Sequence, residues 1–126
     1  MNENEISHAI IESAIEAHKT LGGPGLLESV YEEALVWELE HRGFKLERQL
    51  TVPISYKGNK LSSILRLDLL VNDAVIVEIK SVAAFNPIFE AQLLTYLRLL
   101  NKRLGLVLNF GCHTLKEGIY RVVNRL

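Results

Sequence analysis

The stretch from Arg66 to Lys80 constrains the fold of this chain most strongly, because it places charged residues inside apolar strands. Asp68 lies among leucines, and Glu78 and Lys80 close a run of valine and isoleucine. A carboxylate or ammonium group buried in such surroundings costs several kcal/mol unless it is paired, hydrogen-bonded or bound to an ion. We therefore expect these three charged side chains to converge in one pocket.

Two helices are predicted before any strand. Residues 3–21 carry apolar side chains at three- and four-residue spacing, and residues 26–42 repeat this pattern after the glycine-rich break at 22–25. In the second helix we expect a buried face made of Leu27, Val30, Tyr31, Ala34 and Trp37.

From residue 45 the apolar period changes to two, which predicts strands over residues 45–56 and 61–71 joined by a turn at 57–60. A tight turn at 72–73 then leads into a strand over residues 74–80. Its continuous apolar run favours a central position in the sheet.

A helix over residues 87–102 follows, and strands over 104–110 and 115–123 complete the chain. This order predicts an α/β fold in which a mixed central sheet is flanked by helices. The length is that of one ordinary domain, so we expect a single domain over residues 1–126.

The charged residues point to metal chemistry. Strand alternation puts Glu78 and Lys80 on one face, and the neighbouring strand can bring Asp68 beside them. Carboxylate oxygens, supplemented by a backbone carbonyl such as that of Ile79, are ligands that Mg²⁺ and Mn²⁺ prefer. The same residues also fit a salt-bridged pair of strands without any metal. With metal, phosphodiester hydrolysis is the natural reaction, since Lys80 can offset charge on the phosphate.

The segments Arg66-Leu67-Asp68 and Glu78-Ile79-Lys80 resemble the motif of the PD-(D/E)xK nuclease superfamily, and residues 25–31 (GLLESVY) look like the signature of its GxxExxY branch. The resemblance implies a restriction-endonuclease-like αβββαβ core. It also implies that Asp68 and Glu78 are catalytic metal ligands, that Glu28 is an additional ligand and that Lys80 is the catalytic lysine. Leu67 stands where the superfamily often has proline, which removes no reactive group.

Gln92 and Tyr96 are similar to the QxxxY motif of RecB-like nucleases, and their spacing puts both on one helix face. The resemblance implies that they position nucleic acid or the nucleophile, although Gln92 fits a structural role equally well. Glu28 could instead complement the helix dipole. Arg66 could contact phosphate, or pair with Asp68 or Glu78 when metal is absent.

Several other residues suit structural or surface roles. We expect Tyr31 to be a core aromatic residue whose hydroxyl finds a partner. The histidines lack the spacing of a zinc site. A basic rim in the second half of the chain would consist of Lys102, Arg103, Lys116, Arg121 and Arg125, although solvated surface charges explain such positions equally well.

The net charge of −1 excludes a histone-like binder of polyanions, so any contact with nucleic acid must be local. The single cysteine and the absence of a signal sequence or a membrane-length apolar run favour a cytoplasmic protein without a membrane partner. We expect nucleic acid as the partner, with DNA favoured over RNA, and a homodimer where both strands are cut. The competing hypothesis is a binding or regulatory module that keeps the nuclease fold but cuts nothing.

Overall fold

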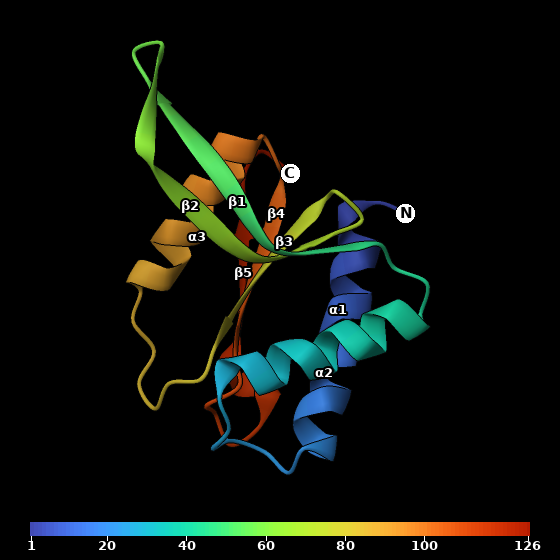
Figure 1. Cartoon of the computed structure of the whole chain (residues 1–126). Coiled ribbons are helices and arrows are strands. Elements are labelled where there is room, and N and C mark those ends of the chain that lie inside the picture. Colours follow the sequence, from blue (N-terminus) through green and yellow to red (C-terminus); the bar gives the residue numbers. More distant parts are fainter.

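A five-stranded mixed sheet, in the order β1-β2-β3-β4-β5, organises the chain. The computed structural model describes all 126 residues (Figure 1). The elements are, in chain order, α1 (Glu3–Thr20), α2 (Glu28–His41), β1 (Leu46–Tyr56), β2 (Asn59–Val71), β3 (Val75–Lys80), α3 (Ile88–Leu100), β4 (Leu104–Asn109), the 3₁₀ turn η1 (Leu115–Gly118) and β5 (Ile119–Val123).

The sheet has one parallel pair, which β3 and β4 form, and its other neighbouring strands are antiparallel. Helix α3 makes the crossover that a parallel pair requires. Every residue of β4 and all but the last of β3 are buried, which explains why both strands are almost purely apolar. The predicted mixed α/β sheet and the central position of β3 are confirmed.

Helices cover both faces of the sheet, and each face has its own core. Helices α1 and α2 pack on one face, where Ile10 and Leu35 meet Val77 of β3. Helix α3 packs on the other face, where Leu93 and Leu97 meet strand residues such as Ile76 (Figure 1). None of the three helices combines the length and hydropathy that crossing a bilayer would demand.

The predicted buried face of α2 was wrong except for Tyr31. Leu27 and Trp37 are 74% and 56% exposed, Val30 is exposed and Ala34 is half-buried. Beside Tyr31, the helix buries Glu32, Leu35, Val36 and Leu39. The helix carries apolar residues on both sides, so the apolar period alone does not decide which side meets the sheet.

The boundary of the last strand also differs from the prediction. Residues Leu115–Gly118 form a 3₁₀ turn, and the strand begins only at Ile119. Gly118 approaches the backbone so closely that an added Cβ would clash with the carbonyl oxygen of Asn109. The turn is therefore fixed by close backbone packing, which strand periodicity does not reveal.

Strands β1 and β2 change faces together near Asp68. Leu67 contacts the core under α3, whereas Leu69, two residues on, contacts the core under α1 and α2. Regular alternation would put both leucines on one face. On β1, Arg48 pairs with Leu69 and Leu50 pairs with Leu67. Gln49 lies between them, and its φ is 48°, in the left-handed region. Beyond this reversal the two strands leave the body as a projecting ribbon (Figure 1).

Candidate active site

The carboxylates of Asp68 and Glu78 lie where strands β2 and β3 separate. The pairing of the two strands ends at Leu69 and Val77. Asp68 and Glu78 are the next residues after this last pair. The backbone N–H of Asp68 donates to Glu78 Oε2 at 3.1 Å, and the N–H of Ile79 donates to Asp68 Oδ2 at 2.8 Å. Each carboxylate therefore takes a backbone donor that the separating strands leave free, and the two acids are held side by side.

Glu78 is the buried member of this pair, with 9% of its surface exposed. Burial, and then the negative charge of Asp68, raise the pKa of Glu78 to about 9, because Lys80 only partly offsets them. Without a cation, Glu78 therefore holds a proton at neutral pH. A divalent ion bound here would favour the ionised form and displace this proton, because its positive charge offsets the two acids.

Lys80 stands beside this pair without a carboxylate partner. Its Nζ lies 4.5 Å from the centre of the Phe89 ring at the start of α3. No carboxylate lies within ion-pair distance of it, since the ion pairs of the chain involve other residues. The salt-bridged strand pair considered from the sequence is therefore not formed, and this ammonium group is available to an incoming anion.

Helix α3 brings Tyr96 to the same place. Partial burial raises the pKa of the Tyr96 hydroxyl, and the negative charges of Glu78 and Asp68 raise it further. Tyr96 therefore lies near enough to the two acids for their charges to act on its hydroxyl. Gln92, one helical turn earlier, is exposed and makes no side-chain hydrogen bond within the chain. Its amide is therefore unpaired within the chain, and its role in binding a substrate stays a prediction.

Glu28 reaches the site from the first turn of α2. Its Oε2 accepts the backbone N–H of Ser81 at 3.1 Å, while the Ser81 hydroxyl donates to the carbonyl oxygen of Leu26 at 2.8 Å. These two bonds fasten the start of α2 to the end of β3. Glu28, Asp68 and Ile79 line one pocket of about 460 Å³.

Tyr31 positions the segment in front of Glu28. Its ring is fully buried, and its hydroxyl donates to the carbonyl oxygen of Gly23 at 2.6 Å and accepts from the N–H of Leu26 at 3.2 Å. The expectation of a core tyrosine with a hydrogen-bonded hydroxyl is confirmed. Within the motif at residues 25–31, the tyrosine orders the loop and the glutamate points into the pocket.

Three residues of this pocket were not singled out from the sequence. Glu32 is 6% exposed and accepts from Arg48 at 3.0 Å and from Gln49 at 2.7 Å. The same Gln49 amide reaches Asp68 Oδ1 at 3.4 Å. The signal for Glu32 was its place one helical turn after Glu28, on the same face of α2. Arg48 and Gln49 carried no comparable signal.

Arg66 lies apart from the acids. It is exposed and forms no ion pair with Asp68 or Glu78, so the suggested pairing in the absence of metal is wrong. It lies beyond the face reversal, on the projecting ribbon. Contact with phosphate is the remaining expectation for Arg66.

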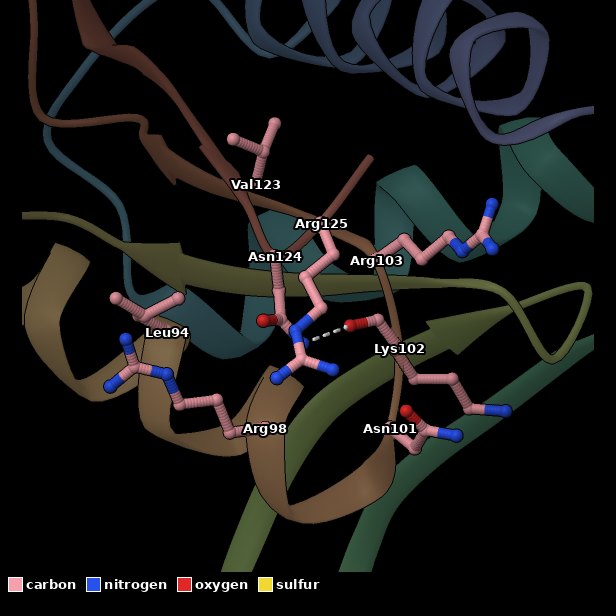
Figure 2. Close-up of a pocket in the computed structure, with 8 residues that line it drawn as sticks. All are labelled: Leu94, Arg98, Asn101, Lys102, Arg103, Val123, Asn124 and Arg125. Atoms are coloured by element: carbon pink, nitrogen blue, oxygen red, sulfur yellow. Dashed lines mark hydrogen bonds between the residues drawn. The ribbon is translucent and has the colours of Figure 1, made fainter.

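The predicted basic rim does not form one surface. Lys116 lines a separate cavity, and Arg121 bonds to Asn4 of α1. The other three residues of the rim share a cavity of about 630 Å³ at the end of α3, which Figure 2 shows. Its lining residues are Leu94, Arg98, Asn101, Lys102, Arg103, Val123, Asn124 and Arg125.

His18 has a structural role, as expected. It is buried, and its Nε2 lies 3.1 Å from the carbonyl oxygens of both Phe110 and Cys112. These contacts join α1 to the segment that follows β4. They leave this nitrogen no role as a metal ligand.

The residues present fit a hard divalent cation. No three His, Cys, Asp or Glu side chains lie close enough to form a complete protein cage. Mg²⁺, however, is commonly bound through one or two carboxylates and keeps several waters. Asp68 and Glu78 provide such a pair, and Glu28 and Ile79 line the same pocket as Asp68.

Comparison with known families agrees with this geometry. A family described as the PD-(D/E)XK nuclease superfamily matches residues 4–122, a span that contains all the acids discussed above and Lys80. No curated protein and no solved structure matches the chain.

Proposed function

Because the chain belongs to the PD-(D/E)XK nuclease superfamily, we propose that it is a Mg²⁺- or Mn²⁺-dependent nuclease that hydrolyses phosphodiester bonds. Asp68, Glu78 and the carbonyl of Ile79 would hold the metal, with Glu28 as an additional ligand. We also assign the chain to the GxxExxY branch, on the basis of residues 25–31.

One observation carries this proposal. Glu78 and Asp68 are held side by side at the end of a buried strand, and Lys80 stands next to them without an ion-pair partner. A purely structural site would neutralise a buried acid by pairing it with that lysine. Neither acid pairs with the lysine here, so a cation that displaces the Glu78 proton can bind at the acids, and the ammonium group remains free for a phosphate.

In the proposed reaction, the metal ligands, Lys80 and the two residues of α3 would have separate roles. A bound divalent ion lowers the pKa of a water molecule and offsets charge on the phosphate. Lys80 adds a positive charge beside the scissile group, where negative charge grows in the transition state. Tyr96 and Gln92, one helical turn apart on α3, would orient the substrate or the attacking water by hydrogen bonds.

The test combines metal binding with cleavage. We expect Mn²⁺ to bind in calorimetry and labelled nucleic acid to be cut in Mn²⁺ but not in EDTA, with DNA and RNA tried as both single strands and duplexes. Asp68→Asn should abolish both signals. Cutting that persists in EDTA, or Mn²⁺ binding that is the same in Asp68→Asn, would contradict the proposal.

A second candidate is a nuclease-fold module that binds nucleic acid without cutting it. The observation in its favour is that no three ligand side chains form a complete cluster. This candidate predicts binding to nucleic acid that is the same in Mn²⁺ and in EDTA, with no product on any substrate.

A further inference from the structure

The ribbon that β1 and β2 form beyond their face reversal is the least buried part of the sheet. Every residue from Ser55 to Ile64 is exposed. The two strands are joined by a two-residue turn at Lys57 and Gly58, both with positive φ, and the tip of the ribbon, residues 55–64, stands clear of the body (Figure 1). The base of the ribbon is anchored, because Val52 and Leu67 belong to the core under α3. A two-stranded tip without a core beneath it is only marginally stable in water, so contact with a ligand would stabilise it.

The ribbon is basic and free of acids. No Asp or Glu occurs between Glu47 and Asp68, a stretch that includes Lys57, Lys60 and Arg66. None of these three cations forms an ion pair in the folded chain. This charge is local, since the whole chain has a net charge of −1.

The surface of the ribbon also offers neutral hydrogen-bonding groups. The hydroxyls of Thr51, Ser55, Ser62 and Ser63 are on exposed residues, and none of them takes part in a hydrogen bond within the chain. Phosphate and sugar oxygens are contacted mainly by basic, hydroxyl and amide side chains. Tyr56, Leu61 and Ile64 are exposed on the same tip, so its surface combines groups for the nucleic-acid backbone with apolar groups that can contact base edges in a groove.

The ribbon is poorly suited to pairing with a second copy of itself. β1 is the edge strand of the sheet, but Pro53 lacks a backbone donor and the register shifts between Pro53 and Ser55. A bulge, an edge proline and lysine side chains all hinder the addition of another strand.

We propose that this ribbon, residues 50–67, is a DNA-binding arm whose exposed tip, residues 55–64, lies in the major groove of a duplex and holds it against Asp68 and Glu78. The inference rests on the proposed nuclease function, and it names the substrate of that site as double-stranded DNA. The B-DNA major groove admits a two-stranded ribbon, whereas the deep, narrow groove of duplex RNA does not.

The length of the ribbon fits this role. At about 3.3 Å per residue, the ribbon carries Lys60 about 26 Å from Asp68. A duplex rises about 3.4 Å per base pair, so this distance corresponds to roughly eight base pairs. One duplex can therefore meet the tip of the ribbon and the carboxylates together.

The arginine cavity in Figure 2 provides a matched control. Arg98 and Arg125 have no ion-pair or hydrogen-bond partner, and Figure 2 shows Arg125 extending toward α3, which carries Arg98. This cavity lies near the start of β4, where Leu104 pairs with Val75 at the start of β3. The acids lie near the other end of β3. Removing two charges here changes the net charge as much as removing two from the ribbon.

The experiment measures binding in EDTA, where nothing is cut, by fluorescence anisotropy of labelled duplex DNA, duplex RNA and single strands. We expect the full chain to prefer duplex DNA. In the double variant Lys57→Gln/Lys60→Gln we expect about tenfold weaker binding and a salt slope smaller by about 1.8, since each lost phosphate contact lowers it by about 0.9. Arg98→Gln/Arg125→Gln should bind as the wild type does.

The possible results separate the arm from the nuclease function. Equal binding by the ribbon variant and the wild type, a loss in the arginine control alone, no preference for duplex DNA, or no binding to any nucleic acid would each overturn the arm. Cleavage in Mn²⁺ that is the same in the ribbon variant and the wild type would support the nuclease function but contradict the DNA-binding role of the ribbon. Ribbon-dependent binding of duplex DNA without any cleavage would support the DNA-binding role but contradict the nuclease function. Thermal melting of the variants confirms that they are folded.

Discussion

Asp68 and Glu78 exchange backbone hydrogen bonds across two separating strands, so that each carboxylate accepts an N–H from the strand that carries the other. This exchange stabilises the end of the β2–β3 pair and brings two negative groups together. The same bonds that close the sheet therefore build the candidate metal site, and substitutions there act on stability and chemistry together.

The first prediction concerns pH. In the metal-free protein the pKa of Glu78 is about 9, against 4.5 as the ordinary value. The folded state therefore binds more protons than the unfolded state between these values, and stability falls as the pH rises from about 5 to 9. Thermal melts in EDTA should show this fall. Glu78→Gln should flatten it, and the same pH dependence in the variant would contradict the assignment to Glu78.

The second prediction concerns Asp68. Asp68→Asn keeps an oxygen that can accept from the Ile79 N–H but removes the charge, so Mn²⁺ binding should be lost while the fold is retained. Asp68→Ala should in addition destabilise the protein by about 1–3 kcal/mol, because a backbone donor loses its partner. Calorimetry and urea unfolding measure the two effects. Asp73→Asn, at an exposed turn, is the control that should bind Mn²⁺ normally.

The third prediction concerns Lys80. Its ammonium group has no ion pair to lose, so Lys80→Ala should leave Mn²⁺ affinity nearly unchanged. Cleavage should fall by about 10²–10³-fold, the usual effect of removing one group that stabilises transition-state charge. Single-turnover assays at saturating Mn²⁺ measure this. Lys102→Ala removes a lysine that pairs with Asp73 and should cut normally, whereas equal rates for Lys80→Ala and the wild type would refute the role of Lys80.

The fourth prediction concerns Tyr31. Tyr31→Phe leaves the ring in place but removes the hydroxyl bonds to Gly23 and Leu26. Loss of these bonds should cost about 1–3 kcal/mol in urea unfolding. It should also loosen the loop before Glu28 and weaken Mn²⁺ binding. A variant with unchanged stability would show that the hydroxyl does not order this loop.

Much of the fold could be predicted because its elements have strong local signals. The alternation in β1, the apolar run of β3 and the spacing of Leu93 and Leu97 in α3 each fix an element type. The face of α2 could not be predicted, since Trp37 and Leu39 compete for burial and only packing decides between them. The 3₁₀ turn before β5 depends on the close approach of Gly118 to Asn109, which is a long-range contact.

The acids and the lysine of the site could be named from the sequence because burying a charge needs a reason. The residues that hold these side chains in place could not be predicted from the sequence. Gln49 has no residue-type preference for the left-handed region, so the reversal that turns Asp68 toward Glu78 leaves no sequence signature. Glu32 and Arg48 look like ordinary surface charges until the fold brings them together.

The exposed ribbon tip has a consequence for how such a chain can diversify. Residues 55–64 bury nothing, so changes of sequence or length there leave both cores and the anchored carboxylates intact. With the proposed functions, target preference and cutting chemistry would reside in parts of the molecule that can vary independently. Exchanging the tip for another hairpin would then be expected to leave the reaction intact.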